Sequence, residues 1–513
     1  MTTSQRIDSL RLVLNNLFQN NEIDNDEAIR AGAANALCVH LGHALNSTTF
    51  HSGIVISILH AISILYQCSN NVREESFLEI GSELLPLIMR AIKTCSRQSP
   101  VIDIHKSYKY GSSILLFLSV IDSAKAEMEK RGEILDFAYA LLQSTQCDEE
   151  TVKLEIVAML KNLSFYTEDY RAKIVRHEDL LIALTRVCNS SSSNVMREGV
   201  ASVLRNLAMG TNVKVSLGRN PYILNTILAL SSDPNVRIRR DAVNATLSLA
   251  LTAENKSILT THYDGAFLRL LSSLLRSDVD VVVRRRAART LRCLSCEDTS
   301  DIILSHSQII KHISKAATQD ISSEVREEAA KALSAWAMES TIELASHVAL
   351  LDAIVRITQG TSSRCIELVA SCLAFQASTP INHEVILNNT SIVNSLLSIV
   401  SQFHFTPLAR ESVFEILSSI SKSEKLSSKL MTLGFLDHIV AALTSKNEEM
   451  FTMRTKNHAA DVVYNLSSNA DNRAFLARQP GLMVALIQFS THTPDMTRKT
   501  GMKKLMMHLV PEL

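Results

Sequence analysis

The sequence contains few of the residues that interrupt helices. It has 14 glycines and 9 prolines in 513 residues, whereas average usage would give about 36 and 26. Aromatic residues make up only 5% of the chain, and hydrophobic residues make up 46%. Strand-rich folds need frequent turns and favour aromatic residues, so this composition argues against a turn-rich all-β protein. We therefore expect an all-α chain with a substantial core.

The chain also lacks a net charge and long hydrophobic runs. Its 52 lysines and arginines balance 52 aspartates and glutamates, so any attraction to nucleic acid or anionic lipid must come from a local patch. The most apolar window, Gly53–Tyr66, covers about 14 residues, which is too short to span a membrane and fits a buried helix. The first residues, MTTSQRIDSLRLVLNN, show no basic segment followed by an apolar core, so we expect no secretory signal.

Signatures of catalysis are missing as well. There is no glycine-rich phosphate loop and no nucleophile elbow, so we predict no catalytic residue, no cofactor and no small-molecule substrate. The nine cysteines are scattered through helical patterns, which indicates reduced thiols and a cytoplasmic or nuclear protein. Cys293 and Cys296 form one C-L-S-C group without a second pair nearby. Because a structural zinc site needs four ligands, we expect no metal site.

What the sequence does contain is a repeated pattern. A basic residue is followed by small or aliphatic positions at helical spacing, and the stretch closes on a polar or small residue, an aliphatic residue, and then usually serine or alanine. These closing tripeptides recur every 43 residues on average, inside the range of about 40–47 residues that is typical of helical repeats. The closing tripeptides end at Ser119, Ser164, Ala208, Ala250, Ser295, Ala337, Ala377, Ser421, Ser467 and Val510.

Within each repeat the pattern predicts amphipathic helices. Val200, Val203, Leu204 and Leu207 are spaced i, i+3, i+4 and i+7, which gives one apolar stripe. A second apolar helix is expected after the closing tripeptide, for example over residues 173–188, 257–275, 429–445 and 474–490. No single repeat can bury its stripe alone, so the repeats must stack on one another.

These residues resemble the armadillo repeat family. The resemblance rests on the recurrent basic-x-x-small-x-x-A-L-x-N-L-S/A helix and on a following helix of the L-x-x-L-L type. It covers residues 101–513 and implies a right-handed α-solenoid of about ten armadillo-like repeats. HEAT repeats are the close alternative. Residues 1–100 follow the pattern only loosely, and we interpret them as a diverged N-terminal helical cap.

One alternative function is cargo binding of the kind seen in nuclear import adaptors. The third helices of those armadillo proteins carry tryptophans and asparagines along a groove that holds a basic peptide. Asn162, Asn206 and Asn465 occupy the asparagine position here, but no tryptophan position holds tryptophan, and Trp336 falls one residue past the asparagine position. Lysine stems would therefore lack aromatic walls. The tryptophan positions hold Ser113, Ala158, Ser202, Asn244, Arg289, Lys331, Ser371, Glu415 and Asp461.

A metal-dependent enzyme is the second alternative. Deoxyhypusine hydroxylases are helical-repeat proteins that bind two irons through symmetric His-Glu pairs. This sequence contains His177-Glu178 and His383-Glu384, but the two pairs lie at different distances from the preceding closing tripeptides. Symmetric ligation requires equivalent positions in the repeats, so we predict that the protein is not this enzyme.

The resemblance also places a basic stretch in the groove, because the third helices of armadillo proteins line their concave face. Residues 236–292 contain 11 lysines and arginines against 5 acidic residues. Arginine pairs bidentately with carboxylate or phosphate, which predicts a site for an extended, acidic segment of a partner protein. At matching places the later repeats are acidic, with Glu367, Glu411, Glu415 and Asp461. The predicted binding residues are Arg240, Arg285, Arg286, Arg289, Lys331, Asn162 and Asn206.

A second set of basic residues recurs at one register, nine positions before the asparagine position. Because they appear in most repeats, we interpret them as architectural residues that pair with a neighbouring repeat. With no catalytic motif present, the whole pattern predicts a non-enzymatic scaffold or adaptor for a protein partner, without specific nucleic-acid binding. The recurring residues are Lys153, Arg197, Arg239, Arg284, Arg410 and Lys456.

Overall fold

The structure, a computed structural model, describes residues 32–67, 74–75, 77–78, 80, 83–144, 150–339, 343–493 and 495–512. Every regular element within these ranges is a helix and none is a strand, which confirms the all-α prediction. The chain divides into a first compact unit, Met1–Thr252, and a second compact unit, Ala253–Leu513.

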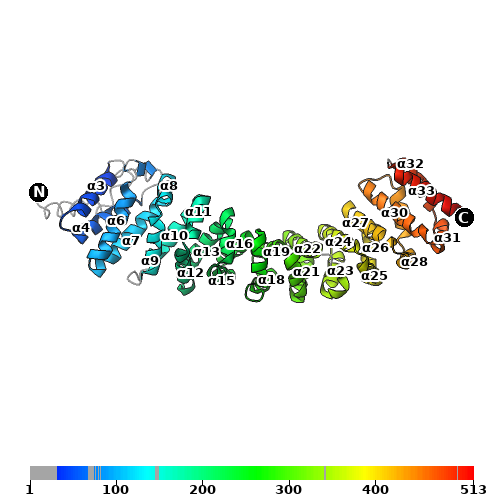
Figure 1. Cartoon of the computed structure of the whole chain (residues 1–513), viewed down its shortest axis with the longest axis horizontal. Helices are drawn as coiled ribbons and strands as arrows, with labels where there is room; N and C mark the ends of the chain where they lie inside the picture. The colour runs from blue at the N-terminus through cyan, green and yellow to red at the C-terminus, as the bar shows by residue number, and fades with distance from the viewer. Residues whose placement is uncertain are drawn as a thin grey trace. The chain divides into compact units, whose positions relative to one another are not determined.

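From α8 onward, the helices of the first unit recur as short, medium and long (Figure 1). One such group is α11, α12 and α13, with 9, 13 and 16 residues. The elements of the first unit are α3 (Ala33–Asn46), α4 (Ser52–Leu65), α6 (Leu84–Gln98), α7 (Val101–Leu118), α8 (Asp122–Lys130), α9 (Glu133–Gln143), α10 (Glu150–Tyr166), α11 (Glu168–Arg176), α12 (Glu178–Ser190), α13 (Asn194–Met209), η2 (Thr211–Val213), α14 (Lys214–Arg219), α15 (Pro221–Ser231) and α16 (Val236–Ala250).

The second unit repeats the same alternation, as in α20, α21 and α22 with 9, 13 and 16 residues. Its elements are α17 (Ala253–Thr261), α18 (Ala266–Ser277), α19 (Val281–Cys293), α20 (Glu297–Ser305), α21 (Ser307–Gln319), α22 (Ser323–Met338), η3 (Leu344–Ser346), α23 (Val348–Thr358), α24 (Ser363–Ala377), η4 (Pro380–Asn382), α25 (His383–Asn388), α26 (Thr390–Ser401), α27 (Pro407–Ser421), α28 (Glu424–Thr432), α29 (Leu436–Thr444), α30 (Met453–Ser468), α31 (Ala470–Arg478), α32 (Leu482–His492), α33 (Met496–Leu509) and η5 (Val510–Glu512).

The last helix of each group ends at or beside a closing tripeptide, and we call these the third helices. They are α7, α10, α13 and α16 in the first unit and α19, α22, α24, α27, α30 and α33 in the second. Third helices pack against one another in sequence order, so that α13 contacts α10 and α16 while α22 contacts α19 and α24. The middle helices α18, α21 and α23 do the same. Such neighbour-to-neighbour packing is the arrangement expected of a helical repeat stack.

From α13 onward, each third helix begins where a polar side chain caps it. The hydroxyl of Ser193 accepts from the backbone N–H of Met196 at 3.4 Å, and Asp280 accepts from that of Val283 at 3.0 Å. Each cap satisfies a backbone donor that the first turn of the helix leaves unpaired. The third helices with capping side chains are α13, α16, α19, α22, α24, α27, α30 and α33, capped by Ser193, Asn235, Asp280, Ser322, Ser362, Thr406, Thr452 and Asp495.

The predicted apolar stripe forms the core between neighbouring repeats. Val200, Val203, Leu204 and Leu207 are each at most 2% exposed. Burying one such side chain stabilises the fold by about 1.5–3 kcal/mol. The helices also approach closely, because Gly199 of α13 leaves no room for a side chain against α10.

The long second helices predicted from the sequence are wrong in one respect, because each is two helices. Residues 173–188 divide at His177, whose Nδ1 accepts from the N–H of Leu180 at 3.2 Å and thereby caps α12. The segment 429–445 divides at Gly434, and 474–490 divides at Gly481, with φ of 85° and 76°. A left-handed residue stops a helix, and glycine adopts that conformation without strain.

The most apolar window of the sequence is α4, and it is a buried helix as predicted, with Ile58, Leu59 and Ile62 at most 1% exposed. In the described part of the chain, no single helix has both the length and the apolar character needed to cross a membrane. One pair, α28 and α29, meets those criteria only when taken together, and it is bent by 85°.

Residue 100 lies inside the first unit, where helices on both sides of it pack together. Pro100 is the N-cap residue of α7. Both α4 and α6 contact α7 across this position. The division between an N-terminal cap of residues 1–100 and a solenoid of residues 101–513 stays a prediction, and the regular elements described in the cap region are helices.

Candidate functional site

The recurring basic residues join neighbouring repeats. In the first unit, Nε of Arg197 donates to Oδ2 of Asp233 at 2.6 Å, and Nη1 donates to the carbonyl oxygen of Ser192 at 2.9 Å. In the second unit, Nε and Nη2 of Arg284 donate to the two carboxylate oxygens of Asp320 at 2.7 and 3.0 Å. The hydrogen bond to Asp320 raises the pKa of Arg284. The architectural interpretation of this register is confirmed for both arginines.

Arg410 occupies the same register but has a different environment. It is 2% exposed, and its Nη2 donates to the carbonyl oxygen of Gln402 at 2.8 Å. Its guanidinium carbon lies 5.8 Å from the centre of the Phe451 ring. Among the residues the structure describes, no carboxylate lies within ion-pair distance of it, and burial lowers its pKa. Arg410 is a core residue.

Asn162 and Asn206, two of the predicted binding residues, hold consecutive third helices together. Nδ2 of Asn162 donates to the hydroxyl of Ser119 at 2.9 Å. Nδ2 of Asn206 lies 3.2 Å from the hydroxyl of Ser164 and 3.2 Å from the carbonyl oxygen of Lys161, and its side chain is 2% exposed. These bonds explain why serine ends so many closing tripeptides, because the serine accepts from the next repeat. A role of these amides in partner binding stays a prediction.

In two other repeats, a donor one residue past the asparagine position reaches back to the preceding repeat. Trp336 is fully buried, and its indole N–H donates to the carbonyl oxygen of Leu291 at 3.0 Å. The side-chain amide of Gln376 donates to the carbonyl oxygen of Ala337. A buried donor must find a partner, so these side chains link the backbone of one third helix to the next. The single tryptophan of the sequence is therefore a structural residue.

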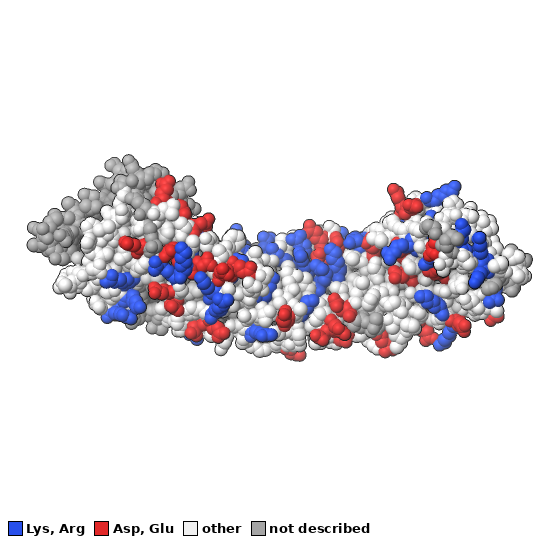
Figure 2. All heavy atoms as spheres, turned by 45° about the horizontal axis from the view of Figure 1, so that its top comes forward, with Lys and Arg blue, Asp and Glu red and all other residues white. Residues whose placement is uncertain are grey.

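Four of the predicted basic residues lie on two neighbouring third helices of the second unit. Arg285, Arg286 and Arg289 belong to α19, and Lys331 belongs to α22. Arg240 lies on α16 in the first unit, where it is half-buried. Figure 2 shows lysine and arginine atoms gathered near the middle of the view, with acidic atoms beside them.

Glutamates of α22 pair with much of this basic stretch. Arg285 forms an ion pair with Glu324, and Nε of Arg292 lies 3.4 Å from Glu328. Lys331 lies 2.8 Å from Glu327, and that hydrogen bond raises the pKa of Lys331. These glutamates lie after residues 236–292, the stretch that is rich in lysine and arginine. One signal in the sequence identifies Glu327, namely its i, i+4 spacing to Lys331.

Arg289 differs from its neighbours on α19. Its side chain is exposed, and no carboxylate in the described ranges lies within ion-pair distance of it. Cys293, one turn further along, is only partly exposed, and burial raises the pKa of its thiol. On α19, Arg289 is therefore an exposed cation flanked by arginines that hold carboxylates of α22.

The acidic positions of later repeats are mostly engaged within the fold. Glu367 is 7% exposed and accepts from the hydroxyl of Thr406 at 2.7 Å. Glu411 is 9% exposed and accepts from the hydroxyl of Thr452 at 2.7 Å. Asp461 accepts from Arg498 at 2.6 Å, whereas Glu415 is exposed. Most of these carboxylates therefore connect repeats.

The two His-Glu pairs perform local structural roles. Besides capping α12, His177 places Nε2 3.1 Å from Oδ1 of Asp136. His383 is 5% exposed, and its Nε2 lies 2.8 Å from the carbonyl oxygen of Ala377. No group of three or more histidine, cysteine, aspartate or glutamate side chains suited to a metal ion occurs among the described residues.

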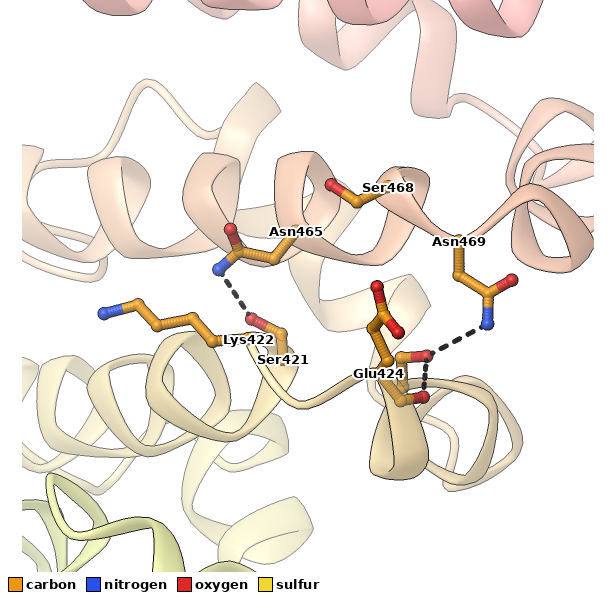
Figure 3. A pocket seen from close by; sticks show the side chains of 7 residues that line it. Ser421, Lys422, Glu424, Asn465, Ser468 and Asn469 are labelled. Atoms are coloured by element: carbon orange, nitrogen blue, oxygen red, sulfur yellow. Dashed lines mark hydrogen bonds between the residues drawn. The ribbon is translucent and has the colours of Figure 1, made fainter.

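A polar pocket of about 260 Å³ lies in the second unit, where α27, α28 and α30 meet (Figure 3). Nδ2 of Asn465 donates to the hydroxyl of Ser421 at 3.0 Å on one side, and Nδ2 of Asn469 donates to that of Ser427 at 3.4 Å on the other. The remaining lining residues are Lys422, Glu424 and Ser468. The lining is polar on every side and is built around the inter-repeat bond of Asn465.

Comparisons with known proteins show a likeness in fold. No protein family model and no curated protein matches the sequence. Among solved structures, the chain is similar to the crystal structure of an engineered protein, with 18% sequence identity and a TM-score of 0.53. That match covers 84% of this chain and 99% of the engineered chain. At this level of identity the likeness concerns the fold alone.

Proposed function

We propose that the protein is a non-enzymatic scaffold that binds an extended acidic segment of a partner protein along the third helices α19 and α22. The observation that carries the proposal is the exposed Arg289, for which the described residues supply no carboxylate. The surrounding surface is basic overall, since α19 and α22 together carry seven basic and three acidic side chains. Such a surface attracts an acidic chain at long range and orients it on contact.

An extended partner fits this face because the helices are already ordered by their neighbours. A stack of helices presents a long surface that is already ordered when the protein has folded. Most of the conformational entropy lost on binding is therefore lost by the flexible partner segment. Arginine favours carboxylates through its planar fork of N–H donors. Since the contacts are exposed, salt screens them, and affinity falls as ionic strength rises.

The architectural part of the proposal is a right-handed solenoid of about ten armadillo-like repeats behind a diverged N-terminal cap. Its support is the recurrence of short, medium and long helices and the position of the closing tripeptides at the ends of third helices. We place such a scaffold in the cytoplasm or nucleus, with a protein as its partner and with no cofactor or metal.

The test is a charge reversal at Arg289 with a matched control on the same unit. Arg289→Glu should weaken binding of a fluorescent decaglutamate peptide roughly tenfold, read by anisotropy at low salt. Arg276→Glu makes the same change at an exposed position of the middle helix α18 and should bind like the wild type. Arg285 is the poorer choice, because its reversal would set two carboxylates together at Glu324 and disturb the fold.

The proposal fails if Arg289→Glu binds decaglutamate as tightly as the wild type, or if the Arg276 control loses as much affinity. A decaglutamine peptide measures binding that does not depend on charge, and it should show none. Circular dichroism melts of both variants should overlay the wild-type curve, since neither side chain is buried.

A further inference from the structure

α19 carries five arginines, of which Arg289 is exposed and the other four are partly buried. Arg285, Arg286 and Arg292 lie four and three positions before Arg289 and three after it, so all are its neighbours on the helix surface. Lys256 of α17 joins them at the end of the helix, where its Nζ donates to the carbonyl oxygen of Ser295 at 2.6 Å. Burial raises the pKa of the Cys293 thiol, and the positive charges of Arg292, Arg289 and Lys256 oppose that rise.

The carboxylates near Arg289 already form ion pairs with other basic side chains. Glu324 pairs with Arg285, and Glu328 lies within ion-pair distance of Arg292 and of Lys331. Glu327 is bound by Lys331, and that hydrogen bond lowers its pKa. A carboxylate of a partner protein would give Arg289 the same kind of ion pair that its neighbouring arginines already form within the fold. A group with two negative charges would interact with several guanidinium groups at once.

We propose that Arg289 and its flanking arginines bind a phosphorylated serine or threonine within the acidic segment of the partner. The inference rests on the proposed function, and it names the feature of the partner that the site selects. A phosphate monoester carries about −1.5 to −2 charges at pH 7 and three strong acceptor oxygens. Its oxygens match the forked donors of arginine, so Arg289 takes one pair of oxygens, while Arg285 and Arg292 contribute N–H donors beyond those that pair with Glu324 and Glu328.

The composition of this face favours a phosphorylated peptide over other phosphate carriers. The helix VVVRRRAARTLRC contains no aromatic residue on which a nucleic-acid base would stack. The carboxylate of Glu324 is 63% exposed beside Arg285, and it would repel a continuous anionic surface such as a charged bilayer. A single phosphate on a flexible segment fits between these acidic groups.

The first experiment compares three peptides that are identical except at one central position, which holds phosphoserine, glutamate or glutamine. The phosphoserine peptide should bind the full chain roughly tenfold tighter than the glutamate peptide, and the glutamine peptide should bind weakest. Arg289→Gln should remove the advantage of phosphoserine, whereas Arg276→Gln should leave it intact. Arg289→Lys keeps the charge but loses the fork, so it should recover only part of the advantage.

The pH dependence of binding separates phosphate from carboxylate. Phosphate takes up a proton near pH 6, whereas a glutamate side chain does so near pH 4.3 and arginine stays charged throughout. Lowering the pH from 7.5 to 5.5 should therefore weaken the phosphoserine peptide several-fold and leave the glutamate peptide nearly unchanged. Inorganic phosphate at millimolar concentration should displace the phosphoserine peptide, which measures how much of the recognition lies in the phosphate alone.

The outcomes distinguish this inference from the proposed function. Equal binding of the phosphoserine and glutamate peptides overturns the inference and leaves the acidic-segment scaffold standing. Failure of both peptides overturns the scaffold itself. If a single-stranded oligonucleotide of matched charge, or vesicles containing phosphoinositide, bind as tightly as the phosphoserine peptide and lose that binding in Arg289→Gln, the phosphopeptide assignment is wrong.

Discussion

Asn206 shows how one side chain holds two repeats together. Its amide reaches both the hydroxyl of Ser164 and the carbonyl oxygen of Lys161, and it is almost fully buried. Removing the amide leaves those acceptors without their donor in a place where water has little access. Losing such a buried hydrogen bond destabilises the protein more than losing an exposed one, because the acceptor left without a donor is still removed from water.

We predict that Asn206→Ala lowers the free energy of unfolding by about 1–3 kcal/mol. Asn212→Ala is the matched control, because Asn212 is exposed and bonds to the carboxylate of Glu168 through its backbone N–H, which alanine retains. Urea unfolding followed by circular dichroism measures both variants. Equal stability of the two variants would show that the amide of Asn206 contributes nothing to the junction between repeats.

Recurrence in the sequence identified some residue roles and missed others. Arg197 and Arg284 were recognisable as architectural because the same basic residue returns in most repeats. The role of Glu324 was not, because its partner Arg285 lies 39 positions earlier and the pairing depends on how two helices face each other. A count of charges in a sequence window contains no such information, and it overstated how much of the basic stretch is open to a partner.

At the scale of the helix, close packing depends on a glycine where two third helices meet. A side-chain carbon added to Gly199 of α13 would lie 2.7 Å from Cγ1 of Val157 on α10. That distance is shorter than carbon atoms tolerate, so the helices must separate or Val157 must leave its rotamer. The opposite case is Gly501 of α33, where an added carbon meets nothing within 4 Å.

We expect Gly199→Ala to destabilise the protein by about 1–3 kcal/mol, because the strain of overpacking exceeds the gain in helix propensity. Gly501→Ala gains the same propensity without strain, so it should stabilise the fold by about 0.5–1 kcal/mol. Chemical denaturation reads both changes. Adding Val157→Ala to Gly199→Ala should recover part of the loss, and strict additivity of the two single changes would argue against the contact.

The helix pattern of the sequence predicted the third helices well and the preceding pairs poorly. An apolar stripe with a capping residue at its start is a local signal, and Val200 through Leu207 with Ser193 carries it in α13. The break between α11 and α12 lacks glycine and proline, and it depends on His177 turning its ring back to cap the next helix. Because the apolar periodicity of the sequence continues through this break, the sequence pattern predicts a single helix.

For the whole molecule, buried cysteines report the integrity of each unit. Cys188 in the first unit and Cys372 in the second are both buried, and burial raises the pKa of each thiol to about 12. The thiolate is the reactive form, so these residues react only when their unit opens. Cys293 and Cys296 are partly exposed.

With Cys68 and Cys147 replaced by serine, we predict that Cys293 and Cys296 react with a disulfide reagent at pH 8 well before the buried thiols, as mass spectrometry of labelled peptides would show. Because the unfolded chain ionises these thiols near their ordinary pKa of about 8.5, the free energy that their burial contributes to folding is complete below that pH and declines as the pH rises above it. Rapid native labelling of Cys188 or Cys372 would contradict the packing described here.

The ion pair between Arg197 and Asp233 links a residue to a loop one repeat further along, and Arg284 and Asp320 do the same. In both pairs the arginine and the aspartate come from adjacent repeats, so the same contact recurs along the chain. Excising one complete repeat, or copying it in tandem, would place an arginine opposite an aspartate again wherever the duplicated segment carries both residues. Such a chain can therefore be shortened or lengthened by complete repeats. Deleting part of a repeat would instead place a guanidinium group opposite the wrong loop.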